Sequence, residues 1–330
     1  MPADCMLPAV PGGNPIRPIF ILSTQRAGST LLQRILGSHE SIGTTSEPSF
    51  LLPLLYSIRR QGASAEYDHS EIAGGVRAFA EAYLPHGLDD YLAGIHDLAL
   101  RLYEEAAPGK QHFVDKTPRY LLVADELVRM FPEGKFVFLF RQPLAVAASI
   151  IDTWAGGKWN LDPHSVDLFG GLDKLIGTYD ANRARAATVR YEDMVAEPHD
   201  VIARLLQYLE VPADDTIVER FADVPMPNPG YWDPHAGSYD GISREPLAKW
   251  RTTMASPLRK AWCRRYLHWL GHDRLATMGY DLADLLREVD SIESDFHDLP
   301  SDLRRATRGY FQRRLRSRIL NVSLPLWNWH

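Results

Sequence analysis

A short segment near the start of the chain combines residue types that bind an anion. It consists of Gln25, Arg26, Ala27, Gly28, Ser29 and Thr30. Its arginine would supply a fixed positive charge, and its serine and threonine would supply hydroxyl donors. An anion held there would also meet the unpaired backbone N–H groups and the dipole of a following helix. The segment therefore predicts an anion-binding turn, and the alternative is a strand-to-helix connection that binds no ligand.

The residues on either side predict the strand and the helix that would position this turn. The run from Pro18 to Leu22 is short and apolar, as expected of a buried strand. After the turn, four apolar residues share one helical face: Leu31, Leu32, Ile35 and Leu36. The turn lacks the Gly-x-x-x-x-Gly-Lys-Ser/Thr string of nucleotide triphosphatases, so the sequence predicts a different kind of anion site.

A second strand end carries another arginine. The run Lys135–Phe140 is almost entirely apolar, which is typical of a strand in a parallel sheet that is covered on both faces. Arg141 follows this run, and Ser149 comes eight residues later, two turns into the next predicted helix. The two side chains could converge on one phosphate, the arginine as a forked charged donor and the serine as a neutral one. The alternative is an arginine that only caps its own strand.

These two segments resemble the nucleotide-binding motifs of the sulfotransferases that use 3′-phosphoadenosine-5′-phosphosulfate (PAPS). Residues 25–32 are similar to the family's 5′-phosphosulfate loop, usually Pro-Arg-Ser-Gly-Thr-Thr and two aliphatic residues, with glutamine here in place of the proline and alanine in place of the serine. Arg141 and Ser149 match the arginine and the serine of the family's 3′-phosphate site. In that site an Arg-Asp-Pro segment is usual, and Gln142 replaces the Asp.

Two later segments resemble the family in the order that it requires. Residues 190–194 are similar to its Tyr-Glu-Asp segment, in which the tyrosine, here Tyr191, approaches the adenine. The late Lys-Trp segment, which closes over the cofactor, is matched by three residues: Lys249, Trp250 and Arg251. On a simpler interpretation, Tyr191 is a core residue with a bonded hydroxyl and Trp250 anchors the preceding loop. The resemblance extends over residues 19–251, about three-quarters of the chain.

The resemblance implies transfer of a sulfuryl group from PAPS to an acceptor hydroxyl, which leaves adenosine 3′,5′-bisphosphate. The segment from Arg26 to Thr30 would hold the 5′ end of the donor, and Arg141 with Ser149 would hold its 3′-phosphate. Such an in-line displacement depends on positioning and charge stabilisation, as phosphoryl transfer does. Side chains supply the cations, no metal-ligand cluster is apparent in the sequence, and no metal is expected. We expect the acceptor to be a hydroxyl on a small molecule, a carbohydrate, a lipid or a peptide, and the sequence leaves these alternatives open.

An acceptor hydroxyl must lose its proton, and we expect Glu47 to take it. Glu47 follows a strand predicted at 42–46, so it would lie near the same sheet edge as Arg26. The glutamate-using branches of the family, which modify protein tyrosines and carbohydrates, resemble this arrangement. Their strand-end lysine matches Lys116, which would stabilise charge on the bridging oxygen together with Arg26. Small-molecule members use a histidine, for which His112 is the candidate. The structural alternatives are a helix-terminal carboxylate for Glu47 and a surface position for Lys116.

Strands alternate with helices along the chain, which predicts an α/β fold with a central parallel sheet flanked by helices. The resemblance implies the P-loop-nucleotide-kinase-like sulfotransferase fold. We expect a catalytic domain over residues 16–280, with a helical insertion at 61–110 that could cover a substrate site, and a helical extension over 281–330. Further strands are expected at 113–118 and 188–191, and helices at 49–60, 121–131, 144–154, 198–209 and 257–270.

Composition narrows the class of protein. The net charge of −6 and the pI of about 6.1 are ordinary for a soluble enzyme and argue against general nucleic-acid binding. The chain has two cysteines, no signal-peptide pattern, and no run near the ~18 apolar residues of a membrane span. These features predict a cytoplasmic protein.

Two further segments lie outside these motifs. Residues 223–245 are rich in proline, glycine and aspartate and are predicted to form an ordered loop that lines the acceptor pocket. Residues 304–318 hold seven arginines, and 319–329 are apolar with two tryptophans. We expect this end to pack on the same chain or on a second subunit in a homodimer, the alternative being a basic helix on a membrane surface.

Two other functions would use the same elements. One is a nucleotide-dependent, kinase-like phosphotransferase, which the missing loop lysine and the lack of an obvious Mg²⁺-binding acid at a strand end disfavour. The other is a binding module that keeps the fold and the nucleotide but has no activity.

Overall fold

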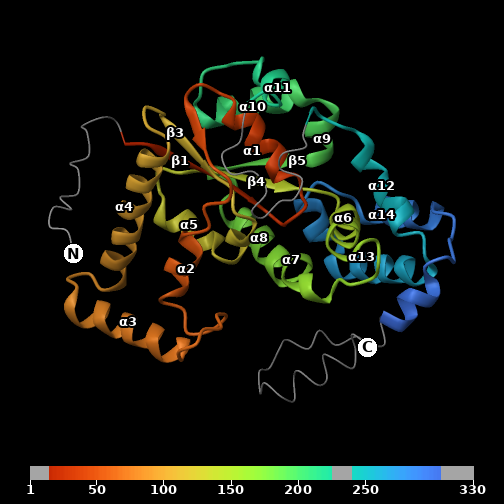
Figure 1. Cartoon of the computed structure of the whole chain (residues 1–330), viewed down its shortest axis with the longest axis horizontal. Coiled ribbons are helices and arrows are strands. Elements are labelled where there is room, and N and C mark those ends of the chain that lie inside the picture. Colours follow the sequence, from red (N-terminus) through yellow and green to blue (C-terminus); the bar gives the residue numbers. More distant parts are fainter. Residues whose placement is uncertain (1–14, 225–239, 306–330) are drawn as a thin grey trace. The chain divides into compact units, whose positions relative to one another are not determined.

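A computed structural model describes residues 15–224 and 240–305 (Figure 1). Its described residues contain a parallel sheet of five strands in the order β2-β3-β1-β4-β5. The strands are β1 (Arg17–Ser23), β2 (Ile42–Thr44), β3 (His112–Asp115), β4 (Lys135–Phe140) and β5 (Ala186–Arg190). The α/β fold with a central parallel sheet is therefore confirmed.

The chain folds into two compact units. One consists of Met1–Phe140 and Gly177–Ile242 and holds the whole sheet, and the other consists of Arg141–Ile176 and Ser243–His330. Each unit thus joins stretches that lie far apart in the sequence. The division of the chain at residue 280 stays a prediction.

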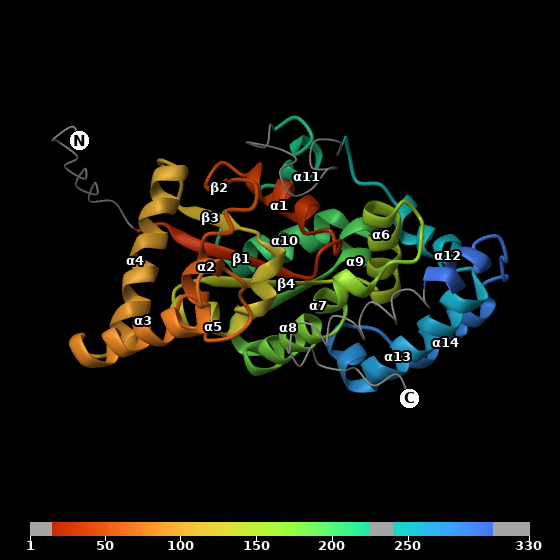
Figure 2. The same ribbon diagram turned by 60° about the horizontal axis from the view of Figure 1, so that its bottom comes forward.

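The sheet forms the core of the first unit because its middle strands, β1 and β4, each contain a continuous apolar run. The side chains of Ile19–Leu22 in β1 are fully buried, and β4 is buried from Phe136 to Phe140. Figures 1 and 2 show α1 and α10 on one face of the sheet and α4 and α5 on the other. These helices span α1 (Ser29–Gly37), α4 (Leu88–Ala106), α5 (Ala124–Met130) and α10 (Pro198–Leu209). Because helices cover both faces of the sheet, side chains on both sides of these strands are buried, which requires a continuous apolar run.

The remaining helices of the first unit are short, apart from one in the predicted insertion. They are α2 (Leu51–Tyr56), α3 (His69–Tyr83), η1 (Pro118–Leu122), η3 (Arg183–Arg185), α9 (Tyr191–Ala196) and α11 (Ile217–Arg220). Residues 61–110 are mostly helical, as expected. The helix expected at 49–60 is found as α2, Leu51–Tyr56. It starts later than expected because Ser49 has a left-handed φ of 60°, which a right-handed helix cannot include.

The second unit is built from helices. They are α6 (Pro143–Ala155), η2 (Asp162–His164), α7 (Ser165–Leu168), η4 (Glu245–Leu247), α12 (Lys249–Thr253), α13 (Pro257–Thr277) and α14 (Leu282–Ser291). The helix α8 (Gly170–Ala181) runs from this unit into the first. The helix expected at 257–270 is present and kinks at Gly271, where φ is 70°. No described helix is long and apolar enough to cross a membrane.

Several predicted features lie outside the described residues. They include residues 225–239, which are most of the predicted acceptor loop, and residues 306–330, with most of the arginines and all of the apolar end. The predictions on pocket lining, membrane contact and subunit packing therefore stay predictions.

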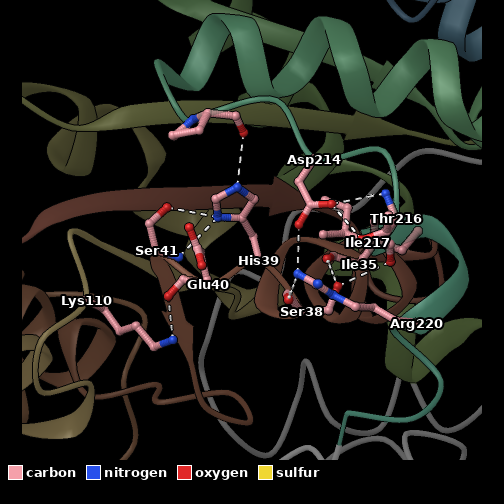
Figure 3. Close-up of polar contacts among 11 residues, drawn as sticks. Ile35, Ser38, His39, Glu40, Ser41, Lys110, Asp214, Thr216, Ile217 and Arg220 are labelled. Atoms are coloured by element: carbon pink, nitrogen blue, oxygen red, sulfur yellow. Dashed lines mark hydrogen bonds and ion pairs between the residues drawn. The ribbon is translucent and has the colours of Figure 1, made fainter.

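A polar network holds the C-terminal end of α1 in place (Figure 3). The Nδ1 atom of the buried His39 ring accepts the Ser41 N–H at 3.1 Å, so the ring can donate from Nε2 to the Pro212 carbonyl at 3.0 Å. Nearby, Arg220 donates to the carbonyl of Ser38 at 2.8 Å and to Asp214 at 2.8 Å. These bonds connect the C-terminal end of α1 to the segment after α10 and so help to fix the position of the whole helix, including its N-terminal end.

Candidate active site

The turn predicted to bind an anion lies between the end of β1 and the start of α1. The strand ends at Ser23 and the helix begins at Ser29. Inside the turn, Arg26 has a φ of 63° and Gly28 has a φ of 99°. Left-handed backbone costs a residue such as arginine about 1 kcal/mol or more and is concentrated at functional sites. The predicted strand, turn and helix are therefore confirmed, and the turn has a strained backbone at its arginine.

The N-terminal end of α1 is suited to an anion. Gly28 occupies the N-cap position and offers no side chain to the first-turn N–H groups, and the first turn contains no acidic residue. The N–H groups of a first helical turn have no partner within the helix and carry the positive end of the helix dipole. Ser29 and Thr30 are buried in this turn. A negatively charged group would thus replace the missing cap.

Tyr191 forms a wall of this turn. It is the first residue of α9, directly after β5, and it is buried. A Cβ atom placed on Gly28 would lie 2.3 Å from the Tyr191 Cδ2 atom, so the ring rests on the glycine backbone. Only glycine allows this approach together with the positive φ. In this structure Tyr191 is a packing partner of the turn, and its contact with adenine stays a prediction.

Glu47 and Lys116 meet beside the same helix terminus. The Lys116 Nζ atom lies 2.7 Å from Glu47 Oε1 and donates to Thr30 Oγ1 at 3.3 Å. The lysine side chain is 3% exposed and the glutamate side chain 14%. Lys116 is therefore not a surface residue. Glu47 precedes the first residue of α2, Leu51, by four positions, so it is not in that helix's first turn.

Gln33, which the motifs did not indicate, positions the end of β2. Gln33 is fully buried in α1, and its Nε2 atom donates to Thr44 Oγ1 at 2.8 Å and to the Thr45 carbonyl at 2.6 Å. Thr44 in turn donates to the Val114 carbonyl at 2.9 Å. The strand exit that leads to Glu47 is thereby fixed to α1 and to β3. The available signal was an uncharged polar residue among the apolar residues Leu31, Leu32, Ile35 and Leu36 of this helix.

Asp115 is a second buried polar residue near the site that the motifs did not indicate. Its side chain is fully buried at the end of β3, next to Lys116 in sequence. Burial raises the pKa of Asp115 to about 6, while hydrogen bonds from Tyr103, Tyr120 and Thr117 and the charge of Lys116 act in the opposite direction. An acidic residue that ends an apolar strand was the signal in the sequence.

The raised pKa of Asp115 predicts a pH dependence of stability. The native state keeps this proton up to about pH 6, whereas the unfolded chain releases it near its ordinary value of 3.8. The free energy of unfolding should therefore fall as the pH rises through this window, by about 3 kcal/mol at most. Urea unfolding of the wild type and of Asp115→Asn from pH 4 to 7 measures it. The wild type should lose stability relative to the variant, and parallel curves would contradict the prediction.

His112 lies at the amino-terminal end of its strand, whereas Glu47 and Lys116 follow the carboxyl ends of theirs. It is the first residue of β3 and is paired in register with Arg17, the first residue of β1. At about 3.3 Å per residue, the length of β3 separates it by about 10 Å from Asp115. Burial, the charges of Arg17 and Lys135, and the neighbouring His39 lower the pKa of the His112 ring, and Glu210 opposes this. The geometry thus separates His112 from the helix terminus at which Glu47 and Lys116 meet.

The residues predicted to bind the 3′-phosphate lie in the second unit. Arg141 is buried, and its Nη2 atom donates to the Pro246 carbonyl in η4 at 3.1 Å. Gln142 is the N-cap of α6, and its Oε1 atom accepts the Ala145 N–H at 2.6 Å. The glutamine thus caps α6 with its side-chain oxygen in place of an aspartate carboxylate. Ser149 lies on the same helix.

The Lys-Trp segment forms α12, which is fixed to α6 within this unit. Thr253 donates to the Asp152 carboxylate at 3.1 Å, and Lys249 lies 3.7 Å from the same carboxylate. Trp250 is buried, as expected of a residue that anchors the preceding loop. Arg251 is exposed and pairs with Glu288 at 3.1 Å. The unit therefore brings Arg141, the helix of Ser149 and the segment 249–251 into one packed group.

Over residues 15–224 and 240–305, no group of three or more histidine, cysteine, aspartate or glutamate side chains is arranged to hold a metal ion. The expectation that the reaction uses no metal stays a prediction.

Comparison with known proteins identifies the class. The chain belongs to the sulfotransferase family, because the model of that family matches residues 18–215, more than half of the chain. This match confirms the resemblance to the sulfotransferase family that the motifs indicated.

Two curated relatives match this chain over part of their own length. Nodulation protein NoeE from Sinorhizobium fredii (strain NBRC 101917 / NGR234) is 30% identical in an alignment of 209 residues that covers 57% of this chain and 48% of NoeE. A protein-tyrosine sulfotransferase from Drosophila melanogaster is 23% identical in an alignment of 223 residues that covers 64% of this chain and 41% of that protein. The chain thus spans about half or less of the length of these relatives.

A solved structure shares the fold. The sulfotransferase domain from the curacin biosynthetic pathway superposes with a TM-score of 0.51 at 24% identity, covering 77% of this chain and 97% of that domain. The predicted sulfotransferase fold is confirmed by this match.

Proposed function

We propose that this enzyme transfers the sulfuryl group of PAPS to an acceptor hydroxyl, with Glu47 as the general base. The observation that carries the proposal is the buried contact of Lys116 with both Glu47 and Thr30, at 2.7 Å and 3.3 Å. It joins a carboxylate, a fixed cation and the anion-binding helix terminus at one place. Membership of the sulfotransferase family supports the same chemistry.

In an in-line displacement, each of these residues would have a separate role. PAPS would supply the sulfuryl group and leave as adenosine 3′,5′-bisphosphate. Glu47 takes the acceptor's proton as the new oxygen–sulfur bond forms. Lys116 and Arg26 stabilise the negative charge that develops on the departing phosphate oxygen when the old sulfur–oxygen bond breaks. The N–H groups of the α1 terminus and the hydroxyls of Ser29 and Thr30 hold the 5′ end.

The 3′-phosphate is assigned to Arg141 and Ser149. Arginine gives a forked, permanently charged donor set that suits phosphate, and serine adds a neutral donor. In this proposal Lys249, Trp250 and Arg251 close over the nucleotide, and Gln25 and Ala27 belong to the turn that surrounds its 5′ end.

The acceptor is proposed only as a class, a hydroxyl on a small molecule, carbohydrate, lipid or peptide. The name of the Drosophila relative supports a phenolic hydroxyl as one member of that class. A cytoplasmic location belongs to the proposal as well. So does packing of the C-terminal segment on the same chain or on a second subunit in a homodimer, with contact of its arginines with a membrane surface as the alternative. The one cysteine among the described residues, Cys263, is a buried free thiol, which agrees with a reducing compartment.

A thermal-shift panel tests the donor. Adenosine 3′,5′-bisphosphate at 100 times its Kd should stabilise the protein by about 2.7 kcal/mol, which raises Tm by a few degrees. ATP with Mg²⁺ should stabilise it much less, since it has no 3′-phosphate. Stabilisation by ATP with Mg²⁺ and not by the bisphosphate would favour the kinase-like alternative. A nucleotide-binding module without activity would respond in the same way as the enzyme but release no bisphosphate from PAPS.

A further inference from the structure

Asp115 is the acceptor of three buried hydroxyl groups. Tyr103 and Tyr120 donate to its Oδ2 atom at 2.6 Å and 3.1 Å, and Thr117 donates to Oδ1 at 3.2 Å. A buried carboxylate is costly unless donors surround it. These partners belong to α4, to η1 and to the turn before η1, and the proposed displacement makes no use of this carboxylate.

Two of the three hydroxyls also hold the backbone that follows Glu47. The Ser49 N–H donates to Thr117 Oγ1 at 3.2 Å, and the Leu51 N–H donates to the Tyr120 hydroxyl at 3.3 Å. A hydroxyl has a single hydrogen. Because Thr117 and Tyr120 give theirs to Asp115, their lone pairs face the two N–H groups. The carboxylate thus sets the direction of both chains of hydrogen bonds.

The segment from Ser49 to Leu51 needs hydrogen bonds from other parts of the chain to hold its conformation. Ser49 has a left-handed φ of 60°, which is unfavourable for serine. The helix α2 begins at Leu51, and its N-cap residue, Phe50, makes no side-chain cap hydrogen bond. Thr117 and Tyr120 therefore act as caps supplied by another part of the chain, and they fix the segment two residues after Glu47.

We propose that Asp115 is a positioning residue that fixes Glu47 for catalysis through Thr117 and Tyr120. Consecutive residues of a strand point to opposite sides, so the end of β3 can direct Lys116 to Glu47 and Asp115 to the hydroxyls that hold its backbone. This inference rests on the proposed function, because it assigns Asp115 a role toward the proposed base. It also explains why a carboxylate is kept where an apolar residue would be easier to bury.

Tyr103 provides a matched control within the same cluster. Tyr103 and Tyr120 are both buried and both donate to Asp115 Oδ2, but only Tyr120 receives a backbone N–H from the segment after Glu47. Replacing either by phenylalanine removes one hydroxyl and keeps the ring. A purely structural cluster would be harmed at least as much by Tyr103→Phe, because its hydrogen bond is the shorter one.

Hydrogen exchange tests the hold on the backbone. Thr117→Val and Tyr120→Phe should speed exchange of the amides at 49–51 by about tenfold or more, whereas Tyr103→Phe and Thr117→Ser should leave it close to wild type. Asp115→Asn should resemble the first pair, since its NH₂ group cannot accept a hydrogen bond. Unchanged exchange in Thr117→Val and Tyr120→Phe would overturn the inference, whether or not Asp115→Asn folds.

Turnover tests the connection to Glu47. The readout is adenosine 3′,5′-bisphosphate released from PAPS in a mixture of phenols and alcohols, per nucleotide-binding site titrated. Thr117→Val and Tyr120→Phe should each lower kcat about tenfold or more with KM for PAPS within threefold, because misplacement affects the chemical step. Tyr103→Phe should keep kcat within threefold. In a Glu47→Ala background, Thr117→Val should lower the residual rate no further.

The outcomes separate the two proposals. If Glu47→Ala keeps the wild-type rate, or if the wild type releases no bisphosphate, the proposed function is wrong and the positioning role falls with it. If Glu47→Ala abolishes turnover but Thr117→Val and Tyr120→Phe keep the wild-type kcat, the proposed function stands and the positioning role is wrong.

Discussion

Glu47→Gln should lower kcat for sulfuryl transfer by about 10²–10⁴-fold, the usual contribution of a general base. The amide keeps an oxygen that can accept the hydrogen bond from Lys116, 2.7 Å away in the wild type, so the site should keep its shape. It cannot take a proton from the acceptor. Binding of adenosine 3′,5′-bisphosphate, measured by calorimetry, should change by less than about threefold because the nucleotide does not depend on this carboxylate.

The control for this substitution is an exposed glutamate that also follows α1. Glu40 lies in the loop between α1 and β2, and Glu40→Gln should leave both kcat and nucleotide binding at wild-type values. Product formation from labelled PAPS with a panel of hydroxyl compounds measures the rates. A kcat of Glu47→Gln within threefold of wild type would rule out Glu47 as the base and reopen the search for one.

Gly28→Ala should weaken binding of adenosine 3′,5′-bisphosphate by about 100-fold or more. The new Cβ would lie 2.3 Å from the Tyr191 ring, and the φ of 99° is one that alanine adopts only at a cost of about 1–2 kcal/mol. Either the ring or the turn has to move. Both effects act on the N–H groups at the start of α1, which are the proposed binding site for the 5′ end.

A glycine elsewhere in the first unit gives the matched control. Gly75 lies within α3, and a Cβ placed on it meets nothing within 4 Å. Gly75→Ala should leave binding unchanged and stabilise the protein by up to about 1 kcal/mol, because alanine is the better helix former. Calorimetry for binding and urea unfolding for stability separate the two variants. Wild-type binding by Gly28→Ala would show that the turn does not contact the nucleotide.

The sequence alone was sufficient for the strongly patterned elements. The strand Lys135–Phe140 and the helix Pro198–Leu209 have the predicted bounds, because a continuous apolar run and a helical periodicity are local properties. The strand, turn and helix predicted to bind an anion were also recognisable, since their residues are contiguous. Weaker patterns gave approximate bounds, as for the helix expected at 49–60 and found as α2. Its start depends on the backbone at Ser49, which no periodicity reveals.

Tertiary structure decided which residues meet. Glu47 and Lys116 are 69 positions apart, and only the strand order β2-β3-β1 makes their strand ends neighbours of each other and of Thr30. Carboxyl ends of parallel strands share one edge of a sheet, whereas their order depends on long-range packing that leaves no local pattern. The same holds for Asp115, whose three hydroxyl donors are recruited from α4, η1 and the turn between β3 and η1. The residue types proposed for catalysis were therefore readable in the sequence, but the contacts that orient them arise only when the sheet assembles.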